Sequence, residues 1–108
     1  MKVKRGNIVY LKPQSVRGHI QSNERPYLVV SNDIGNQSSE IVMVVPMTTQ
    51  LKKLSQPTHT IISYHDSMVL CEQIMTVNQE DIVRVVYRLN DYQMIRVDKC
   101  LKKALGVA

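Results

Sequence analysis

The sequence predicts a mainly β fold closed by one C-terminal α-helix, an α+β arrangement. Its apolar runs are short and rich in β-branched residues, and its Pro and Gly residues fall between those runs. Only the last segment of the chain repeats its apolar residues at helical spacing over a long stretch. Short, regularly spaced strands are typical of a small, strongly curved antiparallel sheet or barrel, and we expect that architecture.

About six strands are expected, each a short apolar run bounded by polar or turn residues. They cover residues 7–11, 25–31, 40–48, 58–62, 68–76 and 82–89. Pro26 cannot donate a ladder hydrogen bond, so it should lie at a strand start or on a sheet edge. Residues 40–48 are almost continuously apolar, which is typical of a central strand buried on both faces. We expect a turn at residues 32–36 and a helical turn at residues 78–81.

The C-terminal segment carries helix signals at both ends. Asn90 is a candidate N-cap with Gln93 three residues on, and Gly106 is a candidate stop. Three lysines gather near the C-terminal end, where positive charge favours a helix. Apolar residues recur at helical spacing at Met94, Val97, Leu101 and Leu105. We therefore expect one long helix between Asn90 and Gly106.

Length and composition limit the class of protein. The chain has 108 residues, 44% of them hydrophobic, and we expect one domain covering residues 1–108 with no need of disulfides. Its 14 Lys and Arg against 9 Asp and Glu leave a formal charge of +5, which favours an anionic partner. Five Tyr without Phe or Trp leave few rings for base stacking. The longest apolar run, residues 41–47, is too short to span a membrane, so we expect a cytoplasmic protein.

Neither the cysteines nor the histidines are spaced for a metal site. Cys71 and Cys100 sit among apolar neighbours and are expected to be reduced thiols without chemistry. His19, His59 and His65 lack Cys or His partners at metal-ligand spacing. With no P-loop, Rossmann glycine pattern or nucleophile elbow either, we expect no metal and no cofactor. The methionines interpreted as gap-filling core are Met43, Met47, Met68, Met75 and Met94.

Two polar residues stand at the ends of predicted strands. Arg25 begins one strand and Thr48 ends the next, so antiparallel pairing of the two would place both on one rim of the sheet. A guanidinium fork and a hydroxyl suit phosphate oxygens, so this rim is a candidate phosphate site. The alternative is structural: Arg25 pairs with a carboxylate such as Glu24 or Glu72, and Thr48 merely ends a strand.

The remaining polar candidates each have a structural alternative. His59 lies on a predicted half-buried strand, where it is either a packed side chain or a catalytic one. Glu72 and Gln73 close an apolar run and form either a buried hydrogen-bonded pair or a site wall. Four loop residues are either solvated charge or phosphate contacts: Arg17, His19, Lys52 and Lys53.

Six segments in order resemble one known family. They are KRGNIVY (residues 4–10), Gly18 with Gln21, ERPYLVVSNDIGN (24–36), VVPMTTQ (44–50), PTHTI (57–61) and DSMVLCEQIMT (66–76). Over nearly its whole length the chain resembles the MazF/PemK (Kid) family of toxin endoribonucleases from bacterial toxin–antitoxin systems. The resemblance implies an SH3-like antiparallel barrel of the CcdB/MazF type, and an obligate homodimer.

The resemblance also implies an activity. This is metal-free, sequence-specific cleavage of single-stranded RNA, in which the ribose 2′-hydroxyl attacks the adjacent phosphate and leaves 2′,3′-cyclic phosphate and 5′-hydroxyl ends. Arg25 would bind the scissile phosphate and Thr48 a phosphate oxygen, with Glu72 or His59 as catalytic or supporting residues. The implied protein partner is an antitoxin with an acidic segment. The residues expected to contact RNA are Arg17, His19, Gln21, Gln50, Lys52, Lys53 and Gln73.

Departures from the family pattern leave other functions open. Met75 replaces the arginine that usually follows the EQI segment, which would remove a positive contact and is consistent with a catalytically inactive RNA-binding or regulatory barrel. The loop after Ile62 is short and residues 18–21 differ, so the cleavage motif does not carry over. A second alternative is a CcdB-like, non-enzymatic gyrase poison acting through the end of its C-terminal helix, although the tail here has no tryptophan.

Overall fold

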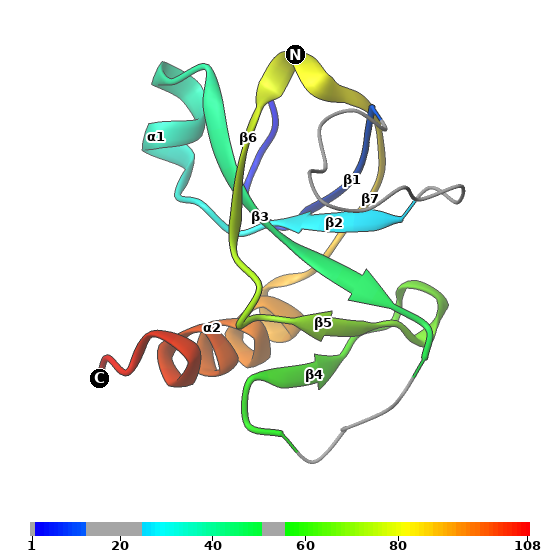
Figure 1. The fold of residues 1–108 in the computed structure, drawn as a ribbon, viewed down its shortest axis with the longest axis vertical. Helices are drawn as coiled ribbons and strands as arrows, with labels where there is room; N and C mark the ends of the chain where they lie inside the picture. Colours follow the sequence, from blue (N-terminus) through cyan, green and yellow to red (C-terminus); the bar gives the residue numbers. More distant parts are fainter. Residues whose placement is uncertain (1, 13–24, 51–55) are drawn as a thin grey trace.

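The computed structural model describes residues 2–12, 25–50 and 56–108. Within these residues a curved antiparallel sheet is closed by a C-terminal helix, so the predicted fold class is confirmed (Figure 1). The strands are β1 (Asn7–Leu11), β2 (Pro26–Val29), β3 (Ile41–Thr48), β4 (His59–Ile61), β5 (Met68–Leu70), β6 (Met75–Asn78) and β7 (Ile82–Arg88). The helices are α1 (Asp33–Ser38) and α2 (Asp91–Leu105), with single 3₁₀ turns η2 (Tyr64–Asp66) and η3 (Gln79–Asp81).

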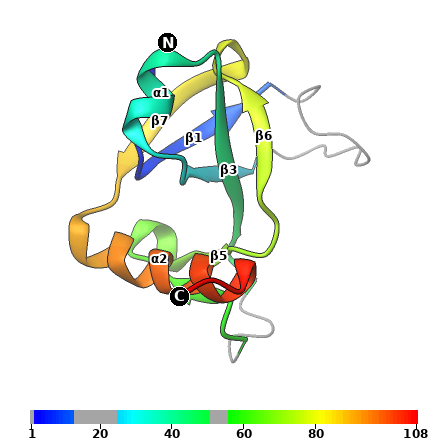
Figure 2. The ribbon, with the colours of Figure 1, turned by 90° about the vertical axis from the view of Figure 1, so that its left-hand side faces the viewer.

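Strand β3 holds the sheet together by changing partners along its length. The strand order is β4-β5-β3-β2-β1-β7, and β6 also pairs with β3. Its first half pairs with β6, its middle with β2, and its last two residues, Met47 and Thr48, with β5. Figure 2 shows β3 running from the region of α1 at one end to β5 and α2 at the other. This exchange of partners bends the sheet, as the short, closely spaced strands predict.

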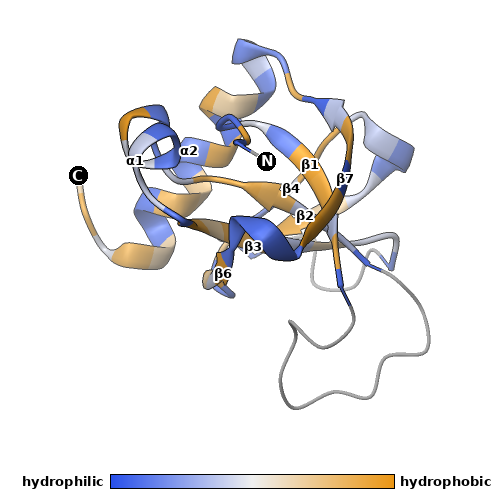
Figure 3. Ribbon diagram, turned by 90° about the horizontal axis from the view of Figure 1, so that it is seen from above, coloured by the Kyte–Doolittle hydropathy of each residue, from blue (hydrophilic) through white to orange (hydrophobic). Residues whose placement is uncertain are grey.

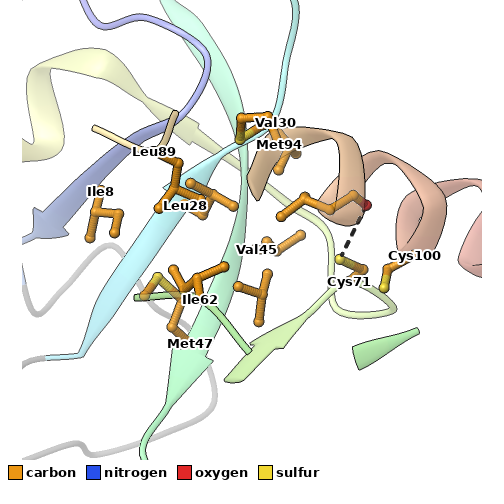
Figure 4. Close-up of a cluster of buried hydrophobic side chains, with 12 residues drawn as sticks. Ile8, Leu28, Val30, Val45, Met47, Ile62, Cys71, Leu89, Met94 and Cys100 are labelled. Atoms are coloured by element: carbon orange, nitrogen blue, oxygen red, sulfur yellow. Dashed lines mark hydrogen bonds between the residues drawn. The ribbon is translucent and has the colours of Figure 1, made fainter. Parts of the chain in front are cut away.

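Two cores lie on the two faces of the sheet. The helix-side core joins residues such as Ile8, Leu28 and Val45 to Met94 and Val97 of α2 (Figure 4). The opposite core contains Val9, Tyr27, Val29 and Val44 among others. Neighbouring residues of one strand therefore enter different cores, which is the period of two expected of a sheet covered on both sides.

Helix α2 follows the predicted pattern at both ends. The side chain of Asn90 accepts a hydrogen bond from the Gln93 N–H at 2.9 Å, and Gly106 ends the helix with a left-handed φ of 69°. Figure 3 shows hydrophilic and hydrophobic residues sharing the helix, and the buried ones are Met94, Val97 and Cys100. Leu105, predicted on the apolar face, is 62% exposed. None of the helices in the described part of the chain is long and apolar enough to cross a membrane.

The predicted strand 68–76 is wrong, because the chain turns in its middle. The Gln73 N–H donates to the Leu70 carbonyl at 3.1 Å and closes a turn after β5. The chain then resumes as β6, which pairs with the first half of β3 instead of the last. Polar Glu72 and Gln73 interrupt the apolar run, and this is the signal that marks the turn.

The predicted turn 32–36 is a capped helix instead. The Asn32 side chain accepts from the Gly35 N–H at 2.8 Å, which makes Asn32 the N-cap of α1. Asn36, on the inner face of α1, is buried and donates its side-chain N–H to the Ser31 carbonyl at 2.9 Å. The five-residue turn therefore extends into six helical residues, Asp33–Ser38.

Strand β3 is buried on both faces only in its second half. Residues 44–47 are buried, but Ile41 is 48% and Met43 43% exposed. The core assignment of Met43 is therefore wrong, while Met47, Met68 and Met94 are buried and Met75 is half-buried. The first half of β3 has one face over the opposite core and one face toward solvent, so it alternates.

Candidate functional site

The register between β2 and β3 places Arg25 and Thr48 side by side. Tyr27 pairs with Pro46 and Val29 with Val44 in an antiparallel ladder, as predicted. Extending that ladder by two residues sets Arg25 opposite Thr48. Both residues line one pocket of about 260 Å³.

Strand β5 forms the floor of this pocket and sets the distance between its walls. Met68 pairs with Thr48 of β3, and Leu70 pairs with His59 of β4. Met68 and Leu70 lie two residues apart and therefore face the same side of β5, toward the pocket. The remaining lining residues are Gln50, Gln56, Glu72 and Gln73.

The structure thus gathers six of the residues singled out in the sequence. Arg25, Thr48, Gln50, His59, Glu72 and Gln73 all line the pocket, although they come from four separate segments. Sequence reasoning missed Gln56, Met68 and Leu70. Met68 and Leu70 belong to a strand that is apolar and buried at every position, so no alternation marks its pocket side, and Gln56 lies in a polar loop without a pattern.

Across the pocket from Arg25, the side chains of Glu72 and His59 form a hydrogen bond. Nε2 of His59 lies 3.0 Å from Oε2 of Glu72, and the hydroxyl of Thr58 donates to Oε1 at 3.1 Å. The His59 side chain is only 4% exposed, whereas Glu72 is 38% exposed and reaches the pocket. His59 is therefore a packed side chain that hydrogen-bonds a carboxylate at the pocket wall.

Hydrogen bonds control the ionisation of Glu72. Partial burial raises the pKa of its carboxyl, but the hydrogen bonds from His59, from its own backbone N–H and from Thr58 outweigh burial and hold the pKa below its usual value of 4.5. Glu72 is therefore ionised at neutral pH. An ionised carboxylate only accepts hydrogen bonds, so Nε2 of His59 carries the proton that they share.

Arg25 is half-exposed and pairs with no carboxylate among the described residues. Glu72, one of its expected partners, is bonded to His59, Thr58 and Gln73 instead. Glu24 lies outside the described residues. Thr48 accepts a hydrogen bond from the Gln50 N–H at 3.1 Å, which leaves its hydroxyl proton available to donate.

Other predicted contacts fall outside the described ranges: Arg17, His19, Gln21, Lys52 and Lys53. Within those ranges, no three His, Cys, Asp or Glu side chains are placed to hold a metal ion. Cys71 and Cys100 are free and buried, and burial raises the pKa of the Cys71 thiol to about 12. A thiol with so high a pKa is a poor nucleophile at neutral pH.

Comparison with solved structures defines the class of fold first. An endoribonuclease from mycobacterial species matches with a TM-score of 0.82 at 20% identity, covering 99% of this chain and 94% of that one. MazF from Deinococcus radiodurans matches with a TM-score of 0.79 at 21% identity, covering 99% of each chain. Both likenesses place the curved sheet and its C-terminal helix in the MazF toxin fold.

Sequence comparison then gives the family. The model of the PemK-like, MazF-like toxins of type II toxin–antitoxin systems matches residues 4–105. Endoribonuclease EndoA of Bacillus subtilis is 35% identical over 99% of this chain and 97% of its own length. Endoribonuclease MazF of Staphylococcus epidermidis is 32% identical over 97% and 92%. The chain belongs to the PemK-like, MazF-like toxin family, which confirms the resemblance of the six segments.

Proposed function

We propose that this protein is a toxin endoribonuclease that cleaves single-stranded RNA at short sequence motifs. The single observation that carries the proposal is the guanidinium of Arg25, which has no partner among the described residues, opposite Thr48 in one pocket with the hydrogen-bonded Glu72 and His59. A positive charge, a hydroxyl donor and an ionised carboxylate within one pocket suit the transfer of a phosphoryl group. The endoribonuclease relatives support the same activity.

The reaction needs no nucleophile from the protein. The ribose 2′-hydroxyl loses its proton as its oxygen attacks the adjacent phosphorus, the bond to the 5′-oxygen of the next nucleotide breaks, and that oxygen takes up a proton. The products therefore end in 2′,3′-cyclic phosphate and 5′-hydroxyl. The protein supplies charge stabilisation and proton transfer. With those groups in place we propose that no metal ion or cofactor takes part.

The polar residues predicted from the sequence then have separate roles in this reaction. Arg25 binds the scissile phosphate through two parallel N–H donors and stabilises the negative charge that grows on it. Thr48 donates its hydroxyl to a phosphate oxygen. Glu72 takes the proton of the 2′-hydroxyl, because it is ionised and exposed toward the pocket, and His59 positions Glu72. Gln50 and Gln73 contact the RNA, joined by Arg17, His19, Gln21, Lys52 and Lys53.

The partners follow from charge, exposed surface and the relatives. Complexes of MazE with MazF from Deinococcus radiodurans and of a mycobacterial endoribonuclease with its cognate antitoxin share the fold. Because this chain carries a formal charge of +5, we propose that its partner is a cognate antitoxin whose acidic segment covers the pocket. Exposed Ile41, Met43, Ile95 and Leu105 offer apolar surface to a second copy in a homodimer. We propose a single cytoplasmic toxin domain covering residues 1–108.

A catalytically silent RNA-binding barrel is the second candidate, suggested by Met75 in place of an arginine. Met75 is half-buried against the opposite core and is not among the residues that line the pocket. The substitution therefore leaves the Arg25 and Thr48 end of the pocket intact, which favours the active enzyme.

Incubation of the full chain with a long single-stranded RNA in EDTA tests the proposal. We expect discrete fragments with 2′,3′-cyclic phosphate and 5′-hydroxyl ends, absent with Arg25→Ala and retained with Arg88→Ala, an exposed arginine of β7 that the pocket does not include. Intact RNA from a folded wild-type protein, across several RNAs, would overturn the proposal in favour of the silent barrel.

A further inference from the structure

The glutamines that the structure describes differ in whether their side-chain amides make hydrogen bonds within the fold. Gln79 is buried, accepts from the Val3 N–H at 3.0 Å and donates to the carbonyls of Asn36 and Ser39 at 2.7 and 2.9 Å. Gln93 accepts from the Ser63 N–H at 2.9 Å and donates to its hydroxyl at 3.0 Å. In Gln79 and Gln93, both the amide N–H group and the amide oxygen make hydrogen bonds within the fold.

The glutamines that line the pocket make few such hydrogen bonds. Within the described part of the chain, no hydrogen bond engages the side chain of Gln50 or Gln56. Gln73 makes one long contact, 3.5 Å from its Nε2 to Oε2 of Glu72. Carboxamides with unused donors and acceptors therefore line the same cavity as Arg25.

The backbone of Gln56 is nevertheless fixed. Its carbonyl accepts from the His59 N–H at 3.1 Å across a turn that contains Pro57, whose ring restricts the backbone. The next residues, Thr58 and His59, hold Glu72 by hydrogen bonds. The Cα of Gln56 is thus tied to the proton-transfer side of the pocket, while its side chain is exposed and has no partner in the described residues.

The chemistry of the pocket is divided accordingly. Arg25 and Thr48 suit a phosphate, which is the same in every nucleotide and carries no sequence information. The apolar side chains of Met68 and Leu70 provide a floor without hydrogen-bonding capacity. A carboxamide presents one donor group beside one acceptor, and this pair matches the edge of an unstacked base.

We propose that Gln56 is a specificity-determining residue that reads the edge of the base adjoining the scissile phosphate. The inference rests on the proposed ribonuclease function and names the part of the pocket that selects its RNA. Replacing the carboxamide by an apolar group of similar size removes the hydrogen bonds to the base edge, and with them the base preference. Replacing it by a carboxylate leaves two acceptors, which match the two adjacent donors of guanine.

The test is a map of cut sites in a long RNA of mixed sequence, with fragment ends counted for each base at each position around the cut. Wild type is compared with Gln56→Leu, Gln56→Glu and Gln37→Leu. Gln37 is exposed on α1 and absent from the pocket, so its variant is the matched control. Because Gln56 is exposed, we expect both Gln56 variants to fold, which thermal unfolding checks.

We expect Gln56→Leu to cut RNA with its base preference at one motif position reduced by about tenfold, the effect of losing a bidentate contact. Gln56→Glu should move the preference at that same position toward guanine, while Gln37→Leu keeps the wild-type motif. An unchanged motif in both Gln56 variants, with active wild-type protein, overturns this inference alone. A wild type that makes no cuts overturns the proposed function, and this inference with it.

Discussion

Arg5 and Arg25 are the same type of residue in two different regions of the molecule, one within the fold and one at the pocket. Arg5 lies where the N-terminal segment meets α2, and its Nε donates to the Val30 carbonyl at 2.8 Å while its guanidinium pairs with Asp98. Its backbone N–H also donates to Asp33 at 2.7 Å. Arg25 makes none of these bonds with the described residues. An arginine bonded within the fold stabilises it, and an unpaired one beside a pocket is available to a ligand.

The largest effect is expected from Arg25→Ala. Removing the cation that faces the phosphate should reduce RNA cleavage by about 10²–10³-fold, as for the loss of one preorganised charge-stabilising group. The free energy of unfolding should stay at the wild-type value, because the side chain has no partner in the described part of the fold. Cleavage rates and urea unfolding measure the two effects, and a variant that is fully active would refute the assigned role.

Arg5→Ala should have the reverse effect. Loss of the hydrogen bond to Val30 and of the pair with Asp98 should lower the free energy of unfolding by about 1–3 kcal/mol. Cleavage by the folded fraction should persist, since Arg5 is not part of the pocket. A double-mutant cycle with Asp98→Ala isolates the contribution of the ion pair. An unchanged unfolding curve would refute the claim that Arg5, unlike Arg25, stabilises the fold.

Glu72→Gln tests whether the carboxylate opposite Arg25 accepts the proton of the 2′-hydroxyl. Loss of the proton acceptor should reduce cleavage by about a hundredfold, the lower end of what a positioned general base contributes. His59→Gln should cause a smaller loss, because Glu72 would remain with one hydrogen bond fewer. Because the pKa of Glu72 lies below its usual 4.5, the wild-type rate should hold as the pH falls to that value and decline only below it. A rate–pH profile measures this limb, which Glu72→Gln should remove; identical profiles would count against the assignment.

The smallest effect is expected on the free energy of unfolding at acidic pH, from Asp33, which accepts a hydrogen bond from the Arg5 backbone. The hydrogen bond from the Arg5 backbone N–H is the main cause of the lowered pKa of Asp33, whose ordinary value is 3.8. A lowered pKa in the folded state stabilises the fold above that ordinary value, and the contribution is lost as the pH falls through the folded pKa. Asp33→Asn should therefore unfold with less dependence on pH below 3.8. Urea unfolding at several pH values measures it, with the exposed Glu80→Gln as control.

The fold was predictable where the pattern is local. The N-cap at Asn90, the stop at Gly106 and the bounds of β1 each depend on neighbours a few residues away. The break between β5 and β6 was missed although polar Glu72 and Gln73 interrupt the apolar run there, because the run itself does not reveal which part of β3 each half will pair with. Exposed Met43 was missed for a similar reason, since burial depends on what covers the other face.

The site was predictable in part for the same reason. Arg25 and Thr48 mark the ends of two consecutive strands, so one antiparallel pairing brings them together. The contact between Glu72 and His59 needs a further strand pairing, of β4 with β5, that residue spacing alone does not establish. Gln56 carries no signal in the sequence, because an exposed amide in a loop looks the same with or without a pocket beside it.

The ladder between β3 and β5 has a mechanical consequence. It joins the two walls of the pocket through only two residue pairs, Met47 with Val69 and Thr48 with Met68, whereas β1 and β7 share five. Few backbone hydrogen bonds would break if the β4–β5 hairpin moved away from β3. The hairpin carries Glu72 and His59, and β2 and β3 carry Arg25 and Thr48. The width of the pocket is therefore held less by backbone pairing than by the buried side chains of Met47 and Val69 in the helix-side core.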